Sequence, residues 1–508
     1  MKRRTSRAGT DPVPAPLRGI IPMLLLTLLV VALAVPAGIA IAPAFLGPDR
    51  SADAAKPAPP WQQAPTRLSS PRGTGGIGPL SASAAAPDAG PLAAQLNDSL
   101  KTDGAGTITG AVQDAATGQL LFDRSGDEAR VPASNMKLFT ASAALRVLGP
   151  DRRFSTKVVA GSAPGSVVLT GGGDVLLGAG ESAPGAVVGH AGLATLAQAT
   201  VRALQNDGVS GTVTVLLDDS LFSGPPLNPA WSPDDVAAGE MAPLYPLATN
   251  SARFDPAKTT GPRPQDAAMA AAEAFTAQLT AAAAAAGLSV APGVVRAPAG
   301  AGSGPEKSGP DKSRPGKGDV RVLAEVQSAT VGQQVDLLLR TSDNYLAEVM
   351  GRMTALAGGR PGSNDGAIAA VLQQLKDMDI PTDTLRAEDV SGLALANQVS
   401  ARQLTDVVRA MTSGKDTRLR AALAGFPVAG LTGTLGDRYT DASTAGGAGL
   451  VRAKTGTLNT VIALSGYVVD ADGRLLVFSF IGNGLTPGAA NKAALDRAAS
   501  VLARCGCR

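Results

Sequence analysis

The sequence predicts an α+β fold in which strands from both ends of the chain share one antiparallel sheet. Residues 107–112 and 119–122 are mostly β-branched or apolar, and the short turn 115–118 between them favours a hairpin. The end of the chain predicts three strands and a closing helix, over 451–454, 461–469, 475–481 and 489–503. The middle of the chain would then be an insertion.

Between these ends, helices and short strands are predicted in turn. Pro132 is suited to the first turn of a helix that runs to about Leu148. A run of mostly Ala and Thr from Asp266 to Ala286 predicts a helix that Gly287 stops. The remaining elements are strands at 167–169 and 213–217 and helices at 331–339 and 344–356.

The N-terminal region resembles an export signal. Five basic residues precede an uncharged stretch, 19–47, which is long enough to span a bilayer. We expect residues 1–19 to be a cytoplasmic tail and residues 20–46 a transmembrane anchor. The alternative is a signal peptide cleaved at 42–44. Both place the remainder outside the cytoplasm: an anchor would hold it in the cell envelope, and a cleaved signal would leave it secreted.

Composition divides the rest of the chain. Residues 47–90 are rich in Pro, Ala, Gly and Ser and predict a disordered linker, and residues 297–318 predict a mobile loop for the same reason. We expect residues 91–160 and 320–508 to form one domain and residues 161–319 to be inserted into it.

Charge and cysteine content exclude other classes. The net charge is only +3, and no basic stripe with interleaved aromatic residues is present, so nucleic-acid binding is not expected. Cys505 and Cys507 are the only cysteines. A bond between residues so close is strained, and two thiols are too few for a metal site, so a frayed tail is expected.

Three short strings carry candidate chemistry, and they are Ser134-Asn135-Met136-Lys137, Ser342-Asp343-Asn344 and Lys454-Thr455-Gly456-Thr457. They supply a nucleophile with a lysine about one helical turn away, a second serine with an amide, and a lysine on a strand. This set of groups is suited to acyl transfer through a serine ester.

The base in such a reaction would be a lysine. His190 is the only histidine, so a Ser-His-Asp triad would depend on that ring, which the Gly/Ala-rich surroundings make a surface or packing residue. A lysine becomes a base when burial and a second cation lower its pKa. Lys137 and Lys454 would affect each other in this way if the fold brings them together.

Each string alone has an ordinary structural explanation. Ser134 and the segment 342–344 fit helix N-caps, and Gly456 fits a bulge. Asp218-Asp219 fits a turn after a strand better than a metal pair, and Trp231 fits a hydrophobic plug. The three strings in this order, on a predicted helix, loop and strand, are specific.

On these motifs the chain resembles the penicillin-recognising serine enzymes, and within them the class C low-molecular-mass penicillin-binding proteins, which are D-alanyl-D-alanine carboxypeptidases and endopeptidases. The 205 positions from Lys137 to Ser342 match the inserted domain of this subfamily. Further similar strings are 171–174, 217–220, Trp231 and 426–435. The family's Asp-Gly-Ser-Gly-Leu is Asp389-Val390-Ser391-Gly392-Leu393 here, and its Gly-Asp-Pro is Gly173-Asp174-Val175. The first of these strings lies close to the site in relatives.

The resemblance implies the fold, the reaction and the roles of the residues. It implies a penicillin-binding-protein/β-lactamase-like transpeptidase fold, with an antiparallel sheet flanked by helices, an all-helical part and a β-rich insert. Ser134 would attack the penultimate D-Ala carbonyl with Lys137 as base, while Ser342 and Lys454 pass a proton to the leaving amine.

The remaining residues would bind and orient the substrate. Asn344 would orient Lys137 and the substrate amide. The N–H groups of Ser134 and Thr457 would form the oxyanion hole, and Thr455 and Thr457 would hold the carboxylate. A β-carbon at Gly456 would crowd the cleft.

The implied partners are peptidoglycan stem peptides, β-lactams as covalent inhibitors and, through the N-terminus, a membrane; no metal or cofactor is expected. Two alternatives stay open. One is a β-lactamase or esterase on the same fold, which would need rapid hydrolysis of the acyl-enzyme. The other is a non-catalytic cell-wall scaffold, which would be expected to carry decayed motifs.

Overall fold

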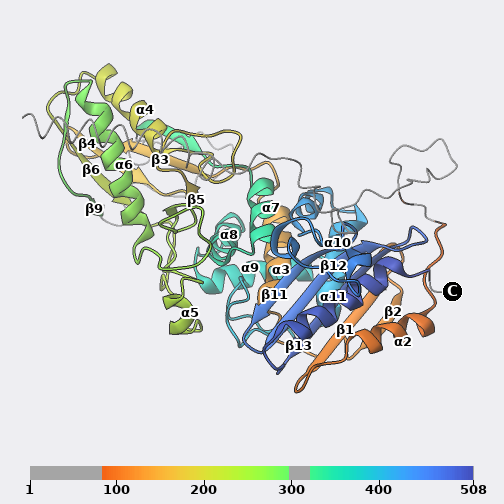
Figure 1. The fold of residues 1–508 in the computed structure, drawn as a ribbon. Helices are drawn as coiled ribbons and strands as arrows, with labels where there is room; N and C mark the ends of the chain where they lie inside the picture. Colours follow the sequence, from red (N-terminus) through yellow and green to blue (C-terminus); the bar gives the residue numbers. More distant parts are fainter. Residues whose placement is uncertain (1–79, 81–82, 297–320, 507–508) are drawn as a thin grey trace, which may run out of the picture. The chain divides into compact units, whose positions relative to one another are not determined.

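The computed structural model describes residues 80, 83–296 and 321–506. One five-stranded sheet has the order β11-β12-β13-β1-β2, and every neighbouring pair is antiparallel (Figure 1). Its strands are β1 (Thr107–Asp114), β2 (Leu120–Arg124), β11 (Arg452–Leu458), β12 (Val461–Val469) and β13 (Leu475–Asn483). The predicted hairpin and the predicted sheet shared by both chain ends are therefore confirmed.

Helices cover both faces of this sheet. Val112, Phe478 and Phe480 pack in one core cluster with residues of α2 (Ala89–Ser99) and α11 (Ala489–Arg504). Their neighbours in sequence point to the opposite face, because side chains alternate along a strand. Ala111 and Val477 accordingly belong to a second cluster, with residues of α10 (Ala401–Ser413).

The helical part is built around α3 (Lys137–Val147), in which every residue from Lys137 to Leu145 is buried. A helix buried on all sides must be surrounded by other elements. Around α3 lie α7 (Val331–Thr341), α8 (Asn344–Ala357), α9 (Asn364–Lys376) and the short 3₁₀ segment η3 (Thr417–Gly425). Two further 3₁₀ turns are η4 (Gly433–Leu435) and η5 (Ala445–Gly447).

A second sheet has the order β10-β3-β4-β6-β8, with β9 also paired to β6. It packs on α4 (Leu193–Asn206) and α6 (Ala267–Ala284) through a third core cluster. Its strands are β3 (Ser155–Ala160), β4 (Ser166–Thr170), β6 (Thr212–Asp218), β8 (Ser289–Val290), β9 (Val295–Arg296) and β10 (Val322–Gln327). The short α5 (Pro233–Ala237) and the pair β5 (Asp174–Leu177) and β7 (Leu247–Thr249) lie in the same stretch of sequence.

Strands β3 and β10 bear on the domain boundaries. Both lie outside the expected insert, 161–319, yet both are strands of the second sheet. We therefore propose that the inserted domain begins with β3 and ends with β10.

Some local expectations differ from the structure. The helix expected from Pro132 begins as a 3₁₀ turn, η2 (Ala133–Met136), before α3 continues it. Helix α2 begins at Ala89, inside the expected linker. Cys505 is 3% exposed and disulfide-bonded, so the expectation that it lies in a frayed tail and the argument against a disulfide were both wrong. The apolar end of α11 packs into the core and places this residue there.

Several expectations concern residues outside the described ranges. They are the cytoplasmic tail, the anchor at 20–46, most of the linker and the loop 297–318. Within residues 80, 83–296 and 321–506, no helix is both long and apolar enough to cross a membrane.

Candidate active site

Ser134 lies in η2, directly before α3. Pro132, Ala133 and Asn135 are buried, whereas Ser134 is half-buried and reaches a cavity. Ala133 has a φ of 47°, a left-handed conformation that is uncommon for a residue with a β-carbon. This unusual backbone sits next to the candidate nucleophile, where strain is often found in enzymes.

The Lys137 amine contacts Ser134. Its Nζ donates to Ser134 Oγ at 2.9 Å, to Asn344 Oδ1 at 2.6 Å and to the Ser391 carbonyl at 2.6 Å. The side chain is fully buried. Burial lowers the pKa of Lys137 to about 8, against the opposing effect of nearby carboxylates, of which Asp389 is the strongest. A lysine with this pKa is partly unprotonated near neutral pH.

Lys454 occupies an equivalent place beside Ser342. Its Nζ donates to Ser342 Oγ at 2.9 Å and to the Thr455 carbonyl at 2.6 Å. Burial, and then the charge of Lys137, lower the pKa of Lys454 well below its usual value. The structure therefore brings together two hydroxyls, two amines and one amide from the three strings.

The turn between α7 and α8 positions Ser342 and Asn344. Ser342 ends α7 with a φ of 61°, and Asp343 caps α8 by accepting from Leu346 N at 3.0 Å. The capping explanation of this string is correct for Asp343. It does not conflict with a role at the site, because the same turn directs Ser342 to Lys454 and Asn344 to Lys137.

Strand β11 forms one wall of the site. Thr455 Oγ1 lies 2.7 Å from Thr434 Oγ1. A β-carbon on Gly456 would lie 2.9 Å from the Pro132 carbonyl and 3.2 Å from Ser134 N. Gly456 is thus required because β11 packs against the backbone of the nucleophile segment. The sequence-based reason, that a side chain would crowd the cleft beside the substrate, stays a prediction.

The loop after α9 supplies the carbonyl that accepts from Lys137, at Ser391. Asp389 anchors this loop by accepting from Gly392 N at 2.7 Å, Ala394 N at 2.8 Å and Asn397 Nδ2 at 2.8 Å. Trp231 is buried, as expected of a plug, and its Nε1 donates to Asp389 at 2.9 Å. The resemblance implied that the string 389–393 lies close to the site, but it gave none of these residues a role there.

Residues between α5 and α6 also reach the site. The Glu240 carbonyl accepts from Asn344 Nδ2 at 3.0 Å, which leaves the amide oxygen of Asn344 facing Lys137. Arg253 Nη1 pairs with Asp343 Oδ2 at 2.7 Å. No sequence pattern pointed to Glu240 or Arg253.

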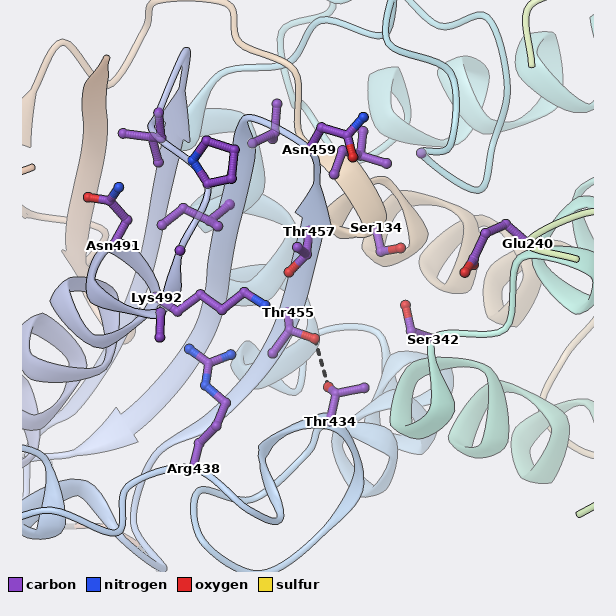
Figure 2. A pocket seen from close by; sticks show the side chains of 18 of the residues that line it. Ser134, Glu240, Ser342, Thr434, Arg438, Thr455, Thr457, Asn459, Asn491 and Lys492 are labelled. Atoms are coloured by element: carbon purple, nitrogen blue, oxygen red, sulfur yellow. Dashed lines mark hydrogen bonds between the residues drawn. The ribbon is translucent and has the colours of Figure 1, made fainter. Parts of the chain in front are cut away.

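A cavity of about 1100 Å³ is bordered by several of these residues, among them Ser134, Ser342, Asn344 and Thr455. Figure 2 shows Ser134 and Ser342 on one part of its wall, with Thr455 and Thr457 on β11 beside them. Glu240 lies on one side of these residues. On the other side the cavity continues to a polar set formed by Arg438, Asn491 and Lys492, while Asn459 lies beyond Thr457.

The other residues considered from the sequence, His190 and the pair Asp218-Asp219, make separate hydrogen bonds and ion pairs. His190 Nε2 is 2.8 Å from Arg153 Nη1, and its Nδ1 is 3.0 Å from the Ala186 carbonyl. Asp218 accepts from Ser220 N at 3.0 Å, a turn contact, and Asp219 pairs with Arg296. In the described part of the chain, no three His, Cys, Asp or Glu side chains cluster in a way that could hold a metal ion.

The shared sheet, the buried helical part and a serine–lysine pair at their junction define a class, the serine acyl-transfer enzymes with a penicillin-binding fold. Comparison with known families gives the same result. The chain belongs to the D-Ala-D-Ala carboxypeptidase 3 (S13) family, whose model matches residues 92–301 and 311–505.

Curated relatives match over most of their length. A carboxypeptidase of Mycobacterium tuberculosis is 37% identical over 436 residues, which is 85% of this chain and 88% of the relative. Carboxypeptidase DacB of Mycolicibacterium smegmatis is 36% identical over 470 residues, 92% of this chain and 94% of the relative. A D-alanyl-D-alanine carboxypeptidase of Actinomadura sp. strain R39 is 31% identical over 440 residues, 75% and 78% of the two chains.

Among solved structures, penicillin-binding protein 4 (dacB) from Haemophilus influenzae superimposes with a TM-score of 0.58 at 20% identity, over 80% of this chain and 97% of that one. This similarity supports the fold. Together, the family and the relatives confirm the predicted family, fold class and enzyme class, a serine-type D-Ala-D-Ala carboxypeptidase with the penicillin-binding fold.

Proposed function

We propose that this enzyme cleaves the D-Ala–D-Ala bond of peptidoglycan stem peptides through an ester on Ser134, and that β-lactams acylate the same hydroxyl. The observation that carries the proposal is the 2.9 Å contact between Lys137 Nζ and Ser134 Oγ, in a buried site where the pKa of Lys137 is lowered to about 8. That contact is within reach for proton transfer.

Acylation then follows from the positions of the groups. Unprotonated Lys137 takes the proton of Ser134 as Oγ bonds to the penultimate D-Ala carbonyl carbon. The N–H groups of Ser134 and Thr457 stabilise the oxyanion. The C–N bond breaks, and Ser342 with Lys454 delivers a proton to the leaving amine. The 2.9 Å contact between Lys454 Nζ and Ser342 Oγ supports this relay.

The remaining residues hold the substrate in the reactive position. The hydroxyls of Thr455 and Thr457 and the Lys454 side chain bind the terminal carboxylate. Asn344 orients the substrate amide, and Gly456 lets β11 approach the nucleophile segment. Water hydrolyses the acyl-enzyme and releases the shortened peptide.

A second candidate activity is D,D-endopeptidase cleavage of cross-links. It is favoured by the extent of the cavity, about 1100 Å³, which continues past Thr455 to Arg438 and Lys492. That space is larger than a single D-Ala leaving group needs and suits a leaving group that carries the rest of a cross-linked peptide.

We also propose that the enzyme works outside the cytoplasm, held by a membrane anchor at residues 20–46. The basic residues before this stretch favour a cytoplasmic N-terminus. A reporter fused after Pro91 should be active only as an exported reporter, and cytoplasmic activity would contradict the proposal. A mature N-terminus near Phe45 would replace the anchor by a cleaved signal.

One experiment tests the activity and separates the alternatives. The protein is incubated with fluorescent penicillin and, separately, with a pentapeptide ending in D-Ala-D-Ala. A long-lived penicillin adduct together with D-Ala release is expected. Rapid loss of the adduct without D-Ala release would indicate a β-lactamase. Neither an adduct nor D-Ala release would indicate a scaffold.

A further inference from the structure

Glu348 is a buried carboxyl group next to the catalytic lysine that the mechanism above leaves unused. It lies on α8, four residues after Asn344 and so on the same side of the helix. The side chain is fully buried. Its Oε1 accepts from Val390 N at 3.0 Å and from Ser391 N at 2.8 Å.

Ser391 connects Glu348 with Lys137. Its N–H donates to Glu348, and its carbonyl accepts from Lys137 Nζ at 2.6 Å. Thr140 Oγ1, on α3, donates to the neighbouring Val390 carbonyl at 2.6 Å. The position of the carbonyl under the amine therefore depends on the bond that Glu348 makes to the same residue.

The second oxygen of Glu348 is not used in a hydrogen bond within the part of the chain that the structure describes. Among the described residues, Glu348 Oε2 is buried without a hydrogen-bond partner. Both oxygens of the nearby Asp389, by contrast, accept hydrogen bonds. Arg352, one turn further along α8, directs its guanidinium to backbone carbonyls, at 3.5 Å from Ser223 and Gly362 and at 3.4 Å from Pro225. A buried carboxyl that serves packing alone would be expected to have both oxygens satisfied.

We propose that Glu348 is a positioning residue of the acylation step: it holds the Ser391 carbonyl against the Lys137 amine, and its charge favours the ammonium form of that amine. The inference rests on the proposed role of Lys137 as the base. It means that Glu348 affects the pH at which Lys137 loses its proton and can act as the base.

The electrostatics of the site agree with this geometry. Burial, and then Asp389, raise the pKa of Glu348 to about 7. Burial lowers the pKa of Lys137 to about 8, so both groups titrate near neutral pH. Because their charges are opposite, each stabilises the charged form of the other. The other charged groups that act on the two are Asp389, Arg352, Asp343, Glu240 and, through its coupling with Lys137, Lys454.

The test is the pH profile of acylation by fluorescent penicillin. Glu348→Gln keeps an oxygen acceptor for the two N–H groups but removes the charge. The midpoint of the alkaline rise should then move down by up to about one pH unit, so that acylation between about pH 7 and 8, where Glu348 is charged in the wild type, is several-fold faster. Glu348→Asp keeps the charge but is one methylene shorter. It should leave the midpoint in place and lower the plateau by about tenfold.

Glu273→Gln is the matched control, since it removes one charge from an exposed position on α6. It should reproduce the wild-type profile. The inference is overturned if Glu348→Gln keeps the wild-type midpoint and loses only plateau rate, provided that Lys137→Ala is inactive. Undiminished acylation by Lys137→Ala would instead overturn the proposed base and this inference together. If Glu348→Gln lacks a cooperative melting transition, the Glu348→Asp profile decides, and a shifted midpoint there counts against the inference.

Discussion

Lys137 and Lys454 are buried in the same site, and the positive charge of Lys137 lowers the pKa of Lys454 in addition to the larger effect of burial. On Lys137, burial has the largest effect and lowers the pKa, while the carboxylates of Asp389, Asp343, Glu348 and Glu240 act against it and favour the charged form. The two amines are therefore not equivalent. Nearby carboxylates favour the charged form of Lys137, whereas a neighbouring cation disfavours the charged form of Lys454.

The rate of acylation should rise with pH around the pKa of Lys137. In the proposed mechanism only the unprotonated amine accepts the Ser134 proton, and the pKa of Lys137 is lowered from the usual 10.5 to about 8. Below that pH the ammonium form predominates and acylation slows about tenfold per unit. Initial rates with fluorescent penicillin between about pH 6 and 10 measure this. A flat profile would exclude Lys137 as the base.

Ser134 should be the residue that β-lactams modify. Intact-mass analysis should show one adduct per chain, and peptide mapping should place it between Arg130 and Lys137. Ser134→Ala should remove the adduct and reduce peptide cleavage by about 10⁶-fold. Ser413→Ala, at an exposed serine of α10, is the control and should behave as the wild type. An adduct on Ser342 would contradict the assignment.

The parts of the site that follow from local spacing could be predicted from the sequence. Ser134 and Lys137 are three residues apart, so any helical turn brings them together, and β12 runs from Val461 to Val469 as its apolar pattern predicts. Glu348 also had a signal, because it follows Asn344 by four residues on one helix. Its importance became visible only when the loop 389–394 was seen to pack on it.

Contacts between distant segments could not be predicted in this way. Arg253 and Asp343 are separated by 90 positions, and Asn344 is bound by a backbone carbonyl 104 positions away. Neither partner has a residue type or spacing that marks it, since a carbonyl is present at every residue and arginines are common on surfaces. Such contacts depend on how the inserted segment packs, which no local pattern encodes.

Arg253→Ala should weaken both the fold and catalysis. Asp343 is nearly inaccessible, and its pKa is lowered by Arg253 and Arg263 against the cost of burial. Removal of Arg253 leaves this buried charge without its ion pair, which should lower the free energy of unfolding by about 3 kcal/mol. Acylation should slow as well, because Asp343 fixes the turn that carries Ser342 and Asn344. Urea unfolding and penicillin acylation measure the two effects.

Arg321→Ala is the control for this change. Arg321 is exposed, and its ion pair with Asp207 lies at the surface, so its loss should leave both measurements unchanged. Equal effects of the two substitutions would show that the Arg253–Asp343 pair has no special role.

Gly392→Ala should displace the nucleophile segment. Gly392 has a φ of 85°, and a β-carbon there would lie 1.9 Å from the Ala133 carbonyl, the residue before Ser134. The backbone must move to relieve this overlap, so the substitution should cost about 3 kcal/mol of stability and most of the acylation rate. Gly473→Ala is a close match, with a φ of 88° and no atom within 4 Å of the added carbon. It should cost only the conformational strain, about 1 kcal/mol, and leave acylation intact. Equal loss of acylation in both proteins would mean that strain alone is responsible, and that the contact between Gly392 and Ala133 does not hold Ser134 in place.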